Sequence, residues 1–156
     1  MADLTTALVH PAVLAAALAF IAKIIRDVWI RHREITSVNT AFLAEIQRLL
    51  GVVKEHEIWW DGLRKASTTG HHPLIAFSHP IYKRQVKNLG LLQPAVAGKV
   101  AKFYGYLEFL NAFQVARVQY GPSQGAEFDR MYHESLQTFL KTFDSLFREE
   151  FQQFGV

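Results

Sequence analysis

The sequence contains no cysteine among its 156 residues. A disulfide framework, a zinc site with thiolate ligands and a cysteine nucleophile are therefore excluded. Alternation of apolar and polar residues, the pattern of a half-buried strand, is also missing over any useful length. Half of the residues are hydrophobic and a fifth are charged, with twelve Phe, five Tyr and three Trp. This composition indicates an ordered protein in which bulky rings pack between helices.

Several motifs of catalysis and cofactor binding are missing too. The chain has no glycine-rich phosphate loop and no His-Glu-x-x-His. No glutamate is followed by histidine three residues later, which is the spacing that di-iron sites in helical bundles use. The densest histidine group, His71, His72 and His79, has no acid nearby. We therefore expect no catalytic residue, no metal and no cofactor.

Acidic residues are absent from the apolar tract near the N-terminus. Residues 4–25 read LTTALVHPAVLAAALAFIAKII and contain one charged side chain, Lys23. As a helix this tract extends about 33 Å, roughly the thickness of the hydrocarbon layer of a bilayer. The sequence therefore predicts a membrane anchor over residues 1–30, with a helical bundle domain over 31–156. The alternative is an Ala-rich helix buried in a soluble oligomer.

Basic residues follow the tract, whereas Asp3 is the one charged side chain before it. The positive-inside rule then predicts an N-terminus outside and a cytoplasmic body. A cleaved signal peptide has the opposite order of charge. The residues expected at the membrane surface are Lys23, Arg26, Trp29, Arg31 and Arg33.

The basic excess lies in the first 120 residues, which hold 14 Lys and Arg against 8 Asp and Glu, whereas residues 121–156 hold 3 against 6. Basic residues next to an anionic lipid surface gain about 1 kcal/mol each, which favours lipid as a partner. The net charge of +3 is too small to indicate nucleic acid. One basic group straddles Gly90 and suits phospholipid headgroups, nucleic acid or an ordinary solvated surface; it comprises Lys83, Arg84, Lys87, Lys99 and Lys102.

Helical periodicity continues from the tract to Lys65, with apolar residues recurring at steps of three and four. Residues 66–73 predict a loop. A short helix is expected over residues 78–88, with Ser78 as N-cap and Gly90 as a left-handed C-terminal cap. Further helices are expected over 94–120 and 123–154, separated by Gly121-Pro122-Ser123. The predicted fold is all-α, a transmembrane helix that continues into a small antiparallel bundle.

Aromatic residues mark the expected core and the expected partner surfaces. Phe143 lies in the middle of the apolar stripe of the last helix and is expected in the core, whereas Phe151 and Phe154 near its end are expected to bind a partner. Trp59 and Trp60 point about 100° apart on a helix, so one is expected in the core and the other at a partner surface. Asp129 and His133, one helical turn apart, are interpreted as a surface pair.

A resemblance covers residues 80–107, which read PIYKRQVKNLGLLQPAVAGKVAKFYGYL. Ile81-Tyr82, then Asn88-Leu89-Gly90-Leu91-Leu92, then Val100 and Phe103-Tyr104 resemble a pattern in uncharacterised bacterial membrane-anchored helical proteins. The resemblance implies a single N-terminal span that precedes a helical cytoplasmic region, and it implies no activity.

The function expected from the sequence is a non-enzymatic, membrane-anchored interaction or accessory subunit. Its expected partners are membrane lipid and either another membrane-associated protein or further copies of this chain. Two alternatives stay open. One is a soluble helical module whose N-terminal helix mediates oligomerisation, and the other is a small hydrolase or nuclease that uses histidine, with Arg130 and His133 as the nearest candidate pair.

Overall fold

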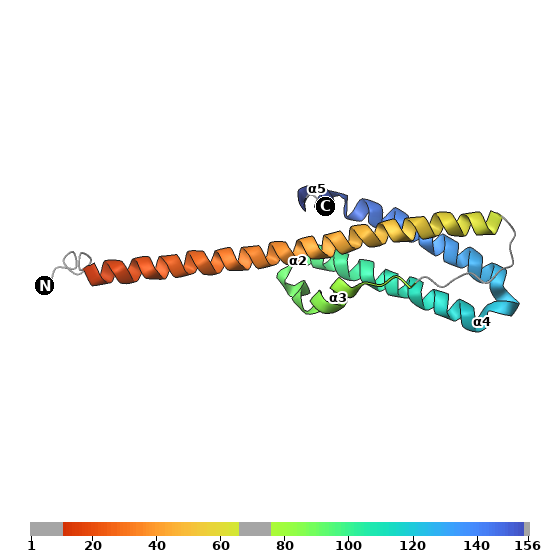
Figure 1. The fold of residues 1–156 in the computed structure, drawn as a ribbon, viewed down its shortest axis with the longest axis horizontal. Coiled ribbons are helices and arrows are strands. Elements are labelled where there is room, and N and C mark those ends of the chain that lie inside the picture. Colours follow the sequence, from red (N-terminus) through yellow and green to blue (C-terminus); the bar gives the residue numbers. More distant parts are fainter. Residues whose placement is uncertain (1–10, 66–75, 155–156) are drawn as a thin grey trace. The chain divides into compact units, whose positions relative to one another are not determined.

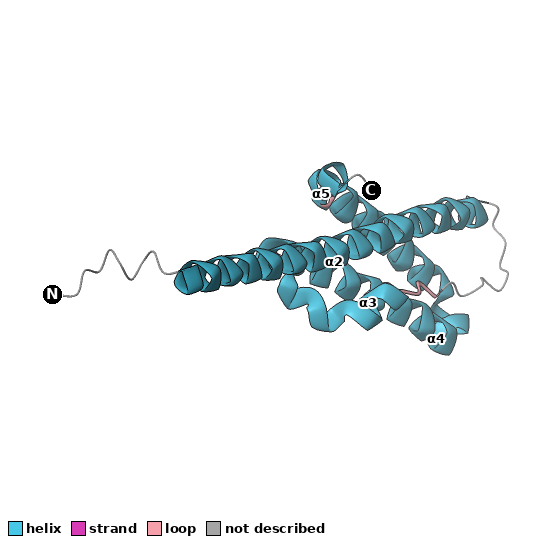
Figure 2. Ribbon diagram, turned by 60° about the vertical axis from the view of Figure 1, so that its left-hand side comes forward, coloured by secondary structure: helices cyan, strands magenta, loops and turns pink. Residues whose placement is uncertain are grey.

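A computed structural model of the chain describes residues 11–65 and 76–154, without the side chains of 63–64, 120–125 and 154. These residues are helical apart from short connecting stretches and contain no strand (Figure 2). The predicted all-α class is therefore confirmed. The chain divides into two compact units, the N-terminal unit Met1–Ser37 and the bundle unit Val38–Val156.

Helix α2 runs from Pro11 to Lys65 and contributes residues to both units. No proline follows Pro11 within it, so nothing interrupts the ladder of backbone hydrogen bonds. The periodicity predicted a helix as far as Lys65, and the described residues are helical up to that point. From Val38 onward, apolar residues at helical spacing form the buried face of α2 in the bundle unit: Val38, Phe42, Leu43, Ile46, Leu49, Leu50, Val53 and Trp60.

The short helical segment after the loop consists of α3, Pro80–Gln85, and the 3₁₀-helix η1, Val86–Leu91. Pro80 occupies the first turn of α3, where its missing N–H costs nothing. His79, not Ser78, is the N-cap, and its side chain makes no capping hydrogen bond. Gly90 lies inside η1 without a positive φ. The predicted capping roles of Ser78 and Gly90 are therefore wrong.

Helix α4, Pro94–Leu146, reverses direction midway (Figure 1). The ring centroids of Phe103 and Phe139 are 5.2 Å apart, whereas 36 residues of straight helix would separate them by about 54 Å. Contact between the rings of Phe113 and Phe128, 5.5 Å apart, places the reversal between these residues. The predicted break at residues 121–123 is thus where the chain turns. The backbone keeps helical conformation there, so the two predicted helices are one element.

Helix α5, Arg148–Phe154, follows a bend at Phe147 that the sequence did not predict. Lys99 Nζ, from the first turns of α4, donates to the carbonyl oxygen of Leu146 at 3.0 Å and pairs with Glu150 Oε1 at 2.5 Å. The ammonium group satisfies a carbonyl at the C-terminal end of α4 and holds α5 through Glu150. The expected single helix over residues 123–154 is therefore divided in two.

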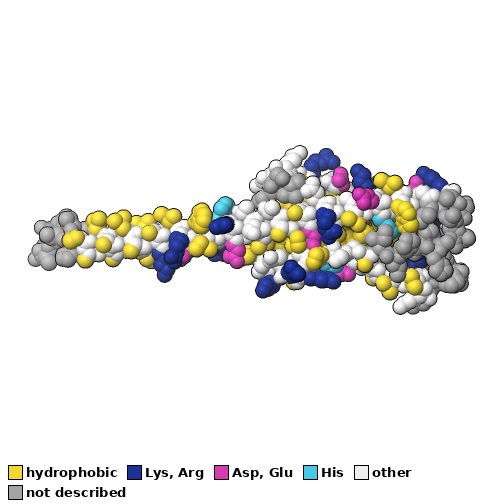
Figure 3. Space-filling view, viewed as in Figure 1, with side chains coloured by type: hydrophobic (Ala, Val, Ile, Leu, Met, Phe, Trp, Pro, Cys, Tyr) yellow, Lys and Arg dark blue, Asp and Glu magenta, His cyan; other side chains and the backbone are white. Residues whose placement is uncertain are grey.

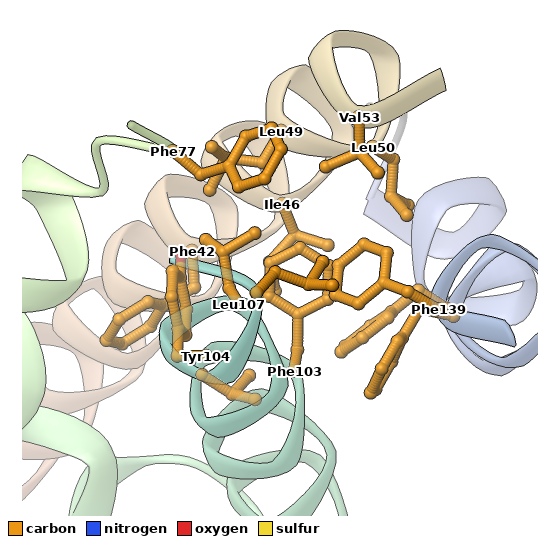
Figure 4. Packing of buried hydrophobic residues seen from close by; sticks show 14 of the residues in the cluster. Phe42, Ile46, Leu49, Leu50, Val53, Phe77, Phe103, Tyr104, Leu107 and Phe139 are labelled. Carbon is orange, nitrogen blue, oxygen red and sulfur yellow. The ribbon is translucent and has the colours of Figure 1, made fainter. Parts of the chain in front are cut away.

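The core of the bundle unit is formed by one face of α2 and the two halves of α4 (Figure 4). Phe103 is fully buried, and its ring lies 5.2–5.9 Å from the rings of Phe139, Phe143 and Phe147. Aromatic pairs at such distances contribute about 0.5–1.5 kcal/mol beyond the burial of their surface. The predicted burial of Phe143 is confirmed.

Candidate functional site

Large apolar side chains cover the surface of the N-terminal unit from residue 13 to residue 30 (Figure 3). Each is between 46% and 65% exposed: Val13, Leu14, Leu18, Phe20, Ile21, Ile24, Ile25, Val28, Trp29 and Ile30. An apolar patch of this extent marks an interaction site in most soluble proteins. Along residues 11–65 and 76–154, no helix combines the length and the apolar character needed to cross a bilayer. Residues 4–10, which begin the predicted anchor, lie outside the described residues.

The basic residues expected at a membrane surface are all exposed in the N-terminal unit: Lys23, Arg26, Arg31 and Arg33. The guanidinium carbon of Arg33 lies 5.6 Å from the centre of the Trp29 ring. This is a cation–π contact between residues one helical turn apart. Arg26 forms an exposed ion pair of 3.8 Å with Asp27. An amphipathic tryptophan with arginine beside it, just after an apolar segment, has the composition of an interfacial belt.

Trp59 and Trp60 near the end of α2 lie in different environments, as their angular offset predicted. Trp60 is 4% exposed, its ring packs edge-on against Tyr132, and the Arg117 guanidinium lies 4.8 Å from the ring centre. Its ring is therefore part of the core. Trp59 is 37% exposed and stacks on the ring of His56. Of the two, Trp59 is the one that presents surface.

His56 is 3% exposed and is surrounded by four aromatic side chains at centroid distances of 5.7–5.9 Å: Trp59, Trp60, Phe77 and Tyr132. Neither ring nitrogen has a hydrogen-bond partner among the described residues. Burial lowers the pKa of His56 to about 4, because the imidazolium would lose its hydration in this apolar cage. His56 is therefore neutral at physiological pH.

We expect the His56→Phe variant to lose part of the pH dependence of folding stability. The pKa of His56 is 6.5 in its ordinary state and about 4 in the folded chain. The folded state thus disfavours protonation, and the stability tied to neutral His56 is present above pH 6.5 and lost as the pH falls towards 4. At 1.4 kcal/mol per pKa unit this loss is roughly 3 kcal/mol. Urea unfolding of the chain shortened to residues 35–156, at neutral pH and near pH 4, measures it.

At neutral pH the His56→Phe variant should be as stable as the wild type or more so, because carbon replaces two unpartnered buried nitrogens. His56→Leu serves as a second variant in case the phenyl ring overpacks the cage. Unfolding free energies of wild type and both variants that fall in parallel with pH would contradict this account of His56.

Polar side chains next to this cage are engaged with one another. Arg117 pairs with Asp129 at 2.5 Å, and Gln114 Nε2 donates to the Tyr132 hydroxyl at 2.7 Å. His133 is buried, and its Nε2 lies 3.0 Å from Gln137 Nε2. The interpretation of Asp129 and His133 as a surface pair is therefore wrong.

Arg130 and His133, the candidate pair of the nuclease alternative, also lie in different environments. Arg130 is exposed and bound by Glu127 and Glu134 on its own helix, at 2.5 and 2.6 Å. His133 is buried and lies 3.8 Å from Glu57 on α2. The two side chains thus do not share an accessible face, which is what acid–base chemistry on a substrate needs.

The C-terminal aromatic residues lie on α5. Phe151 is half-buried, with its ring 6.0 Å from the ring of Phe147. The side chain of Phe154 lies outside the described ones. Phe151 thus contacts the core along one edge and leaves the other exposed.

A buried carboxylate, Glu45, holds the start of α3. Glu45 is 2% exposed, and its Oε1 accepts the Ile81 N–H at 2.7 Å, while its Oε2 accepts the Tyr82 N–H at 2.9 Å and the Tyr104 hydroxyl at 2.6 Å. These two amides belong to the first turn of α3, where backbone N–H groups have no acceptor within the helix. Glu45, a residue of α2, therefore acts as the N-terminal cap of α3. Burial and the Glu45 carboxylate raise the pKa of Tyr104 above its usual range.

His79 reinforces the same junction. It is buried, its Nδ1 lies 3.0 Å from the Phe77 carbonyl oxygen and its Nε2 lies 2.8 Å from Glu108 Oε1. The backbone amide of Phe77 donates to Asn111 Oδ1 at 2.9 Å. Side chains of α2 and α4 thus fix residues 77–82 through polar contacts, and His79 orients the chain there.

No group of three His, Asp or Glu side chains within the described ranges is arranged to hold a metal ion. His71 and His72 of the predicted histidine group lie outside those ranges. Sequence reasoning missed Glu45 and His56, two of the buried polar residues. Both follow the spacing of the apolar face of α2, Glu45 three residues after Phe42 and His56 three residues after Val53, and a polar residue at such a position was the available signal.

Comparison with known proteins gives this chain no relative: no family model, no curated protein and no solved structure matches it. The resemblance of residues 80–107 to membrane-anchored helical proteins thus stays a prediction. Function has to be argued from the side chains themselves.

Proposed function

We propose that this protein is a non-enzymatic accessory subunit that is attached to a membrane through its N-terminal segment and binds other proteins through the bundle unit. In this proposal residues 1–30 enter the bilayer with the N-terminus outside, and the bundle unit is cytoplasmic. Lys23, Arg26, Arg31 and Arg33 lie at the lipid headgroups.

The observation that carries the proposal is the exposure of apolar side chains between Val13 and Ile30. Ten large apolar side chains at about half exposure would cost the free energy of hydrating their surface if water were their permanent environment. Acyl chains remove that cost. The change from apolar residues to Trp29, Arg31 and Arg33 then coincides with the boundary between hydrocarbon and headgroup.

Two partner contacts are proposed on the bundle unit, one at Trp59 near the end of α2 and one at Phe151 on α5. Trp59 offers an exposed aromatic face next to Ile58, which is 61% exposed. Trp, with a large rigid ring, is enriched among the residues that dominate binding energy at interfaces. Phe154 is the further partner residue that the sequence predicts.

The full chain is expected to stay with membranes after carbonate extraction, whereas the chain shortened to residues 35–156 should be soluble and helical. The physical reason is that the shortened chain lacks every exposed apolar side chain of the segment 13–30. Fractionation followed by immunoblotting measures the first outcome, and circular dichroism the second.

The paired substitutions Leu18→Asp and Ile21→Asp sharpen this test. Each Asp costs about 2.5–3.5 kcal/mol at the centre of an inserted helix, so the variant should be released. The matched control carries Ala44→Asp and Gln47→Asp at two exposed positions of α2 in the bundle unit and should be retained. Release of the wild-type chain together with an oligomer in solution would support the oligomerisation alternative instead.

A further inference from the structure

The outer face of α3 and η1 is basic. The 12 residues from Pro80 to Leu91 contain no acid, and Lys83, Arg84 and Lys87 are all exposed. Lys87 follows Lys83 by four residues and Arg84 by three, about one helical turn, whereas Lys83 and Arg84 are adjacent and point about 100° apart. Figure 3 shows Lys and Arg side chains gathered over this segment. We call these three residues the α3–η1 basic face.

The inner face of the same segment is apolar and fixed. Tyr82, Leu89 and Leu91 pack against the core, and the ring of Tyr82 stacks on that of Tyr104 with centroids 4.0 Å apart. The Glu45 carboxylate holds the backbone at the start of α3. The segment is thus a short amphipathic element whose basic side chains are presented on a rigid base.

Among the described residues, no carboxylate forms an ion pair with Lys83, Arg84 or Lys87. Glu45 is buried beneath α3 and accepts three hydrogen bonds. Glu108 is engaged with His79 at 2.8 Å. Arg48, on the neighbouring turn of α2, adds a further positive charge and donates to the Ser78 carbonyl oxygen at 2.9 Å. Lys99 of the basic group predicted from the sequence is paired with Glu150 and does not contribute.

The basic face lies at the end of the bundle unit where its chain begins. The ring of Tyr82 lies 6.4 Å from that of Phe42, one of the first buried residues of this unit. The proposed membrane segment precedes Phe42 in the chain. If residues 1–30 enter a bilayer, this end of the bundle unit is the one tethered closest to the anionic headgroups.

We infer that the α3–η1 basic face binds the headgroups of anionic phospholipids, giving the bundle unit a second contact with the membrane. The inference rests on the proposed membrane attachment, which makes a bilayer the nearest anionic surface. Lipid, more than nucleic acid, fits the small flat cluster of three charges, because +3 over the whole chain is too little for phosphate-backbone binding. Val86, 43% exposed between the basic residues, adds an apolar contact at the interface.

The test uses the full chain with Leu18→Asp and Ile21→Asp, so that insertion does not mask binding by the face. Sedimentation with phosphatidylglycerol vesicles at low salt measures the partition coefficient. Lys83→Gln, Arg84→Gln and Lys87→Gln together should lower it by about fivefold per residue, or roughly a hundredfold in all. Phosphatidylcholine vesicles should bind neither the chain with Leu18→Asp and Ile21→Asp nor the same chain with the three Gln substitutions.

The matched control neutralises Lys54, Lys141 and Arg148 to Gln, which are two exposed lysines and one exposed arginine elsewhere on the bundle unit. Net charge changes equally in both triple variants, so the control should lose only a few-fold. Circular dichroism verifies that both stay folded, as expected for exposed substitutions. Equal losses of vesicle binding in the two triple variants would overturn the inference. It would also be overturned if the Lys83, Arg84 and Lys87 variant bound vesicles like the unsubstituted face but lost binding to an oligonucleotide.

The outcomes separate this inference from the proposed attachment. If the wild-type chain resists carbonate but the two triple variants bind vesicles equally, the inference about the basic face is wrong and the proposed attachment stands. A wild-type chain that carbonate releases overturns insertion, while a selective loss with phosphatidylglycerol still supports the basic face.

Discussion

Replacing Glu45 by alanine should lower the free energy of unfolding by about 3–5 kcal/mol. Hydrogen bonds to a charged group contribute about 1.5–3 kcal/mol each, and Glu45 accepts three. Part of that gain is offset in the wild type by the cost of burying the carboxylate. Removal of the side chain leaves the Tyr104 hydroxyl and two amides of α3 without their acceptor. Urea unfolding of residues 35–156 measures the loss.

Three further variants make the result specific to the cap. Gln47→Ala, at an exposed position on the same helix, should change stability by less than about 0.5 kcal/mol. Tyr104→Phe removes one of the three bonds and should cost about 1–3 kcal/mol. Glu45→Gln keeps the shape but replaces one acceptor oxygen by an amide donor, so it should fall between wild type and alanine.

Amide hydrogen exchange separates the cap from mere packing. In Glu45→Ala the N–H groups of Ile81 and Tyr82 should exchange much faster, whereas amides in the middle of α4 should follow only the global loss of stability. Unchanged protection of Ile81 and Tyr82 would mean that Glu45 does not hold α3.

The second large effect is expected at Phe143. Its ring is fully buried, with ring centroids of Phe103 and Phe139 at 5.3 and 4.9 Å. Phe143→Ala should cost about 3–5 kcal/mol, the usual loss for a core phenylalanine. Phe151→Ala, on half-buried α5, should cost clearly less and weaken association with a partner. Comparing the unfolding free energies of the two variants measures the first effect. A pull-down with the full chain measures the second.

Small and equal losses at Phe143 and Phe151 would contradict the fold described above. The aromatic stripe of the second half of α4 would then be an interface that another protein covers, and the bundle unit would not be self-contained.

Helix ends and the aromatic core were predictable because they follow local rules. Pro94 begins α4, since proline is tolerated in the first turn of a helix. Helix α2 is helical as far as Lys65, as its apolar periodicity predicts. The stripe through Phe139 and Phe143 was predicted from its spacing and is buried. Only residues near in sequence decide these features.

The buried polar sites could not be predicted in the same way, because their partners are distant in sequence. The spacing of Glu45 from Phe42 indicates a position on the buried face of α2, but only the approach of Ile81, 36 residues later, gives its carboxylate a role. The bend at Phe147 likewise depends on Lys99, 47 residues before the Leu146 carbonyl that it binds. Gly90 was assigned a left-handed cap on its residue type alone, yet η1 uses it in an ordinary conformation.

The reversal within α4 has a consequence for the order in which the bundle unit assembles. The hydrogen bond from Gln114 to Tyr132 closes a loop of 18 residues, whereas the bond from Tyr104 to Glu45 closes one of 59. Loop-closure entropy favours the smaller loop by about 1 kcal/mol, so the two halves of α4 pair before α2 docks on them. During synthesis, however, α2 leaves the ribosome first. The apolar face of α2 thus stays uncovered until both halves of α4 have been made, and exposed apolar surface of this kind favours aggregation or binding by a chaperone.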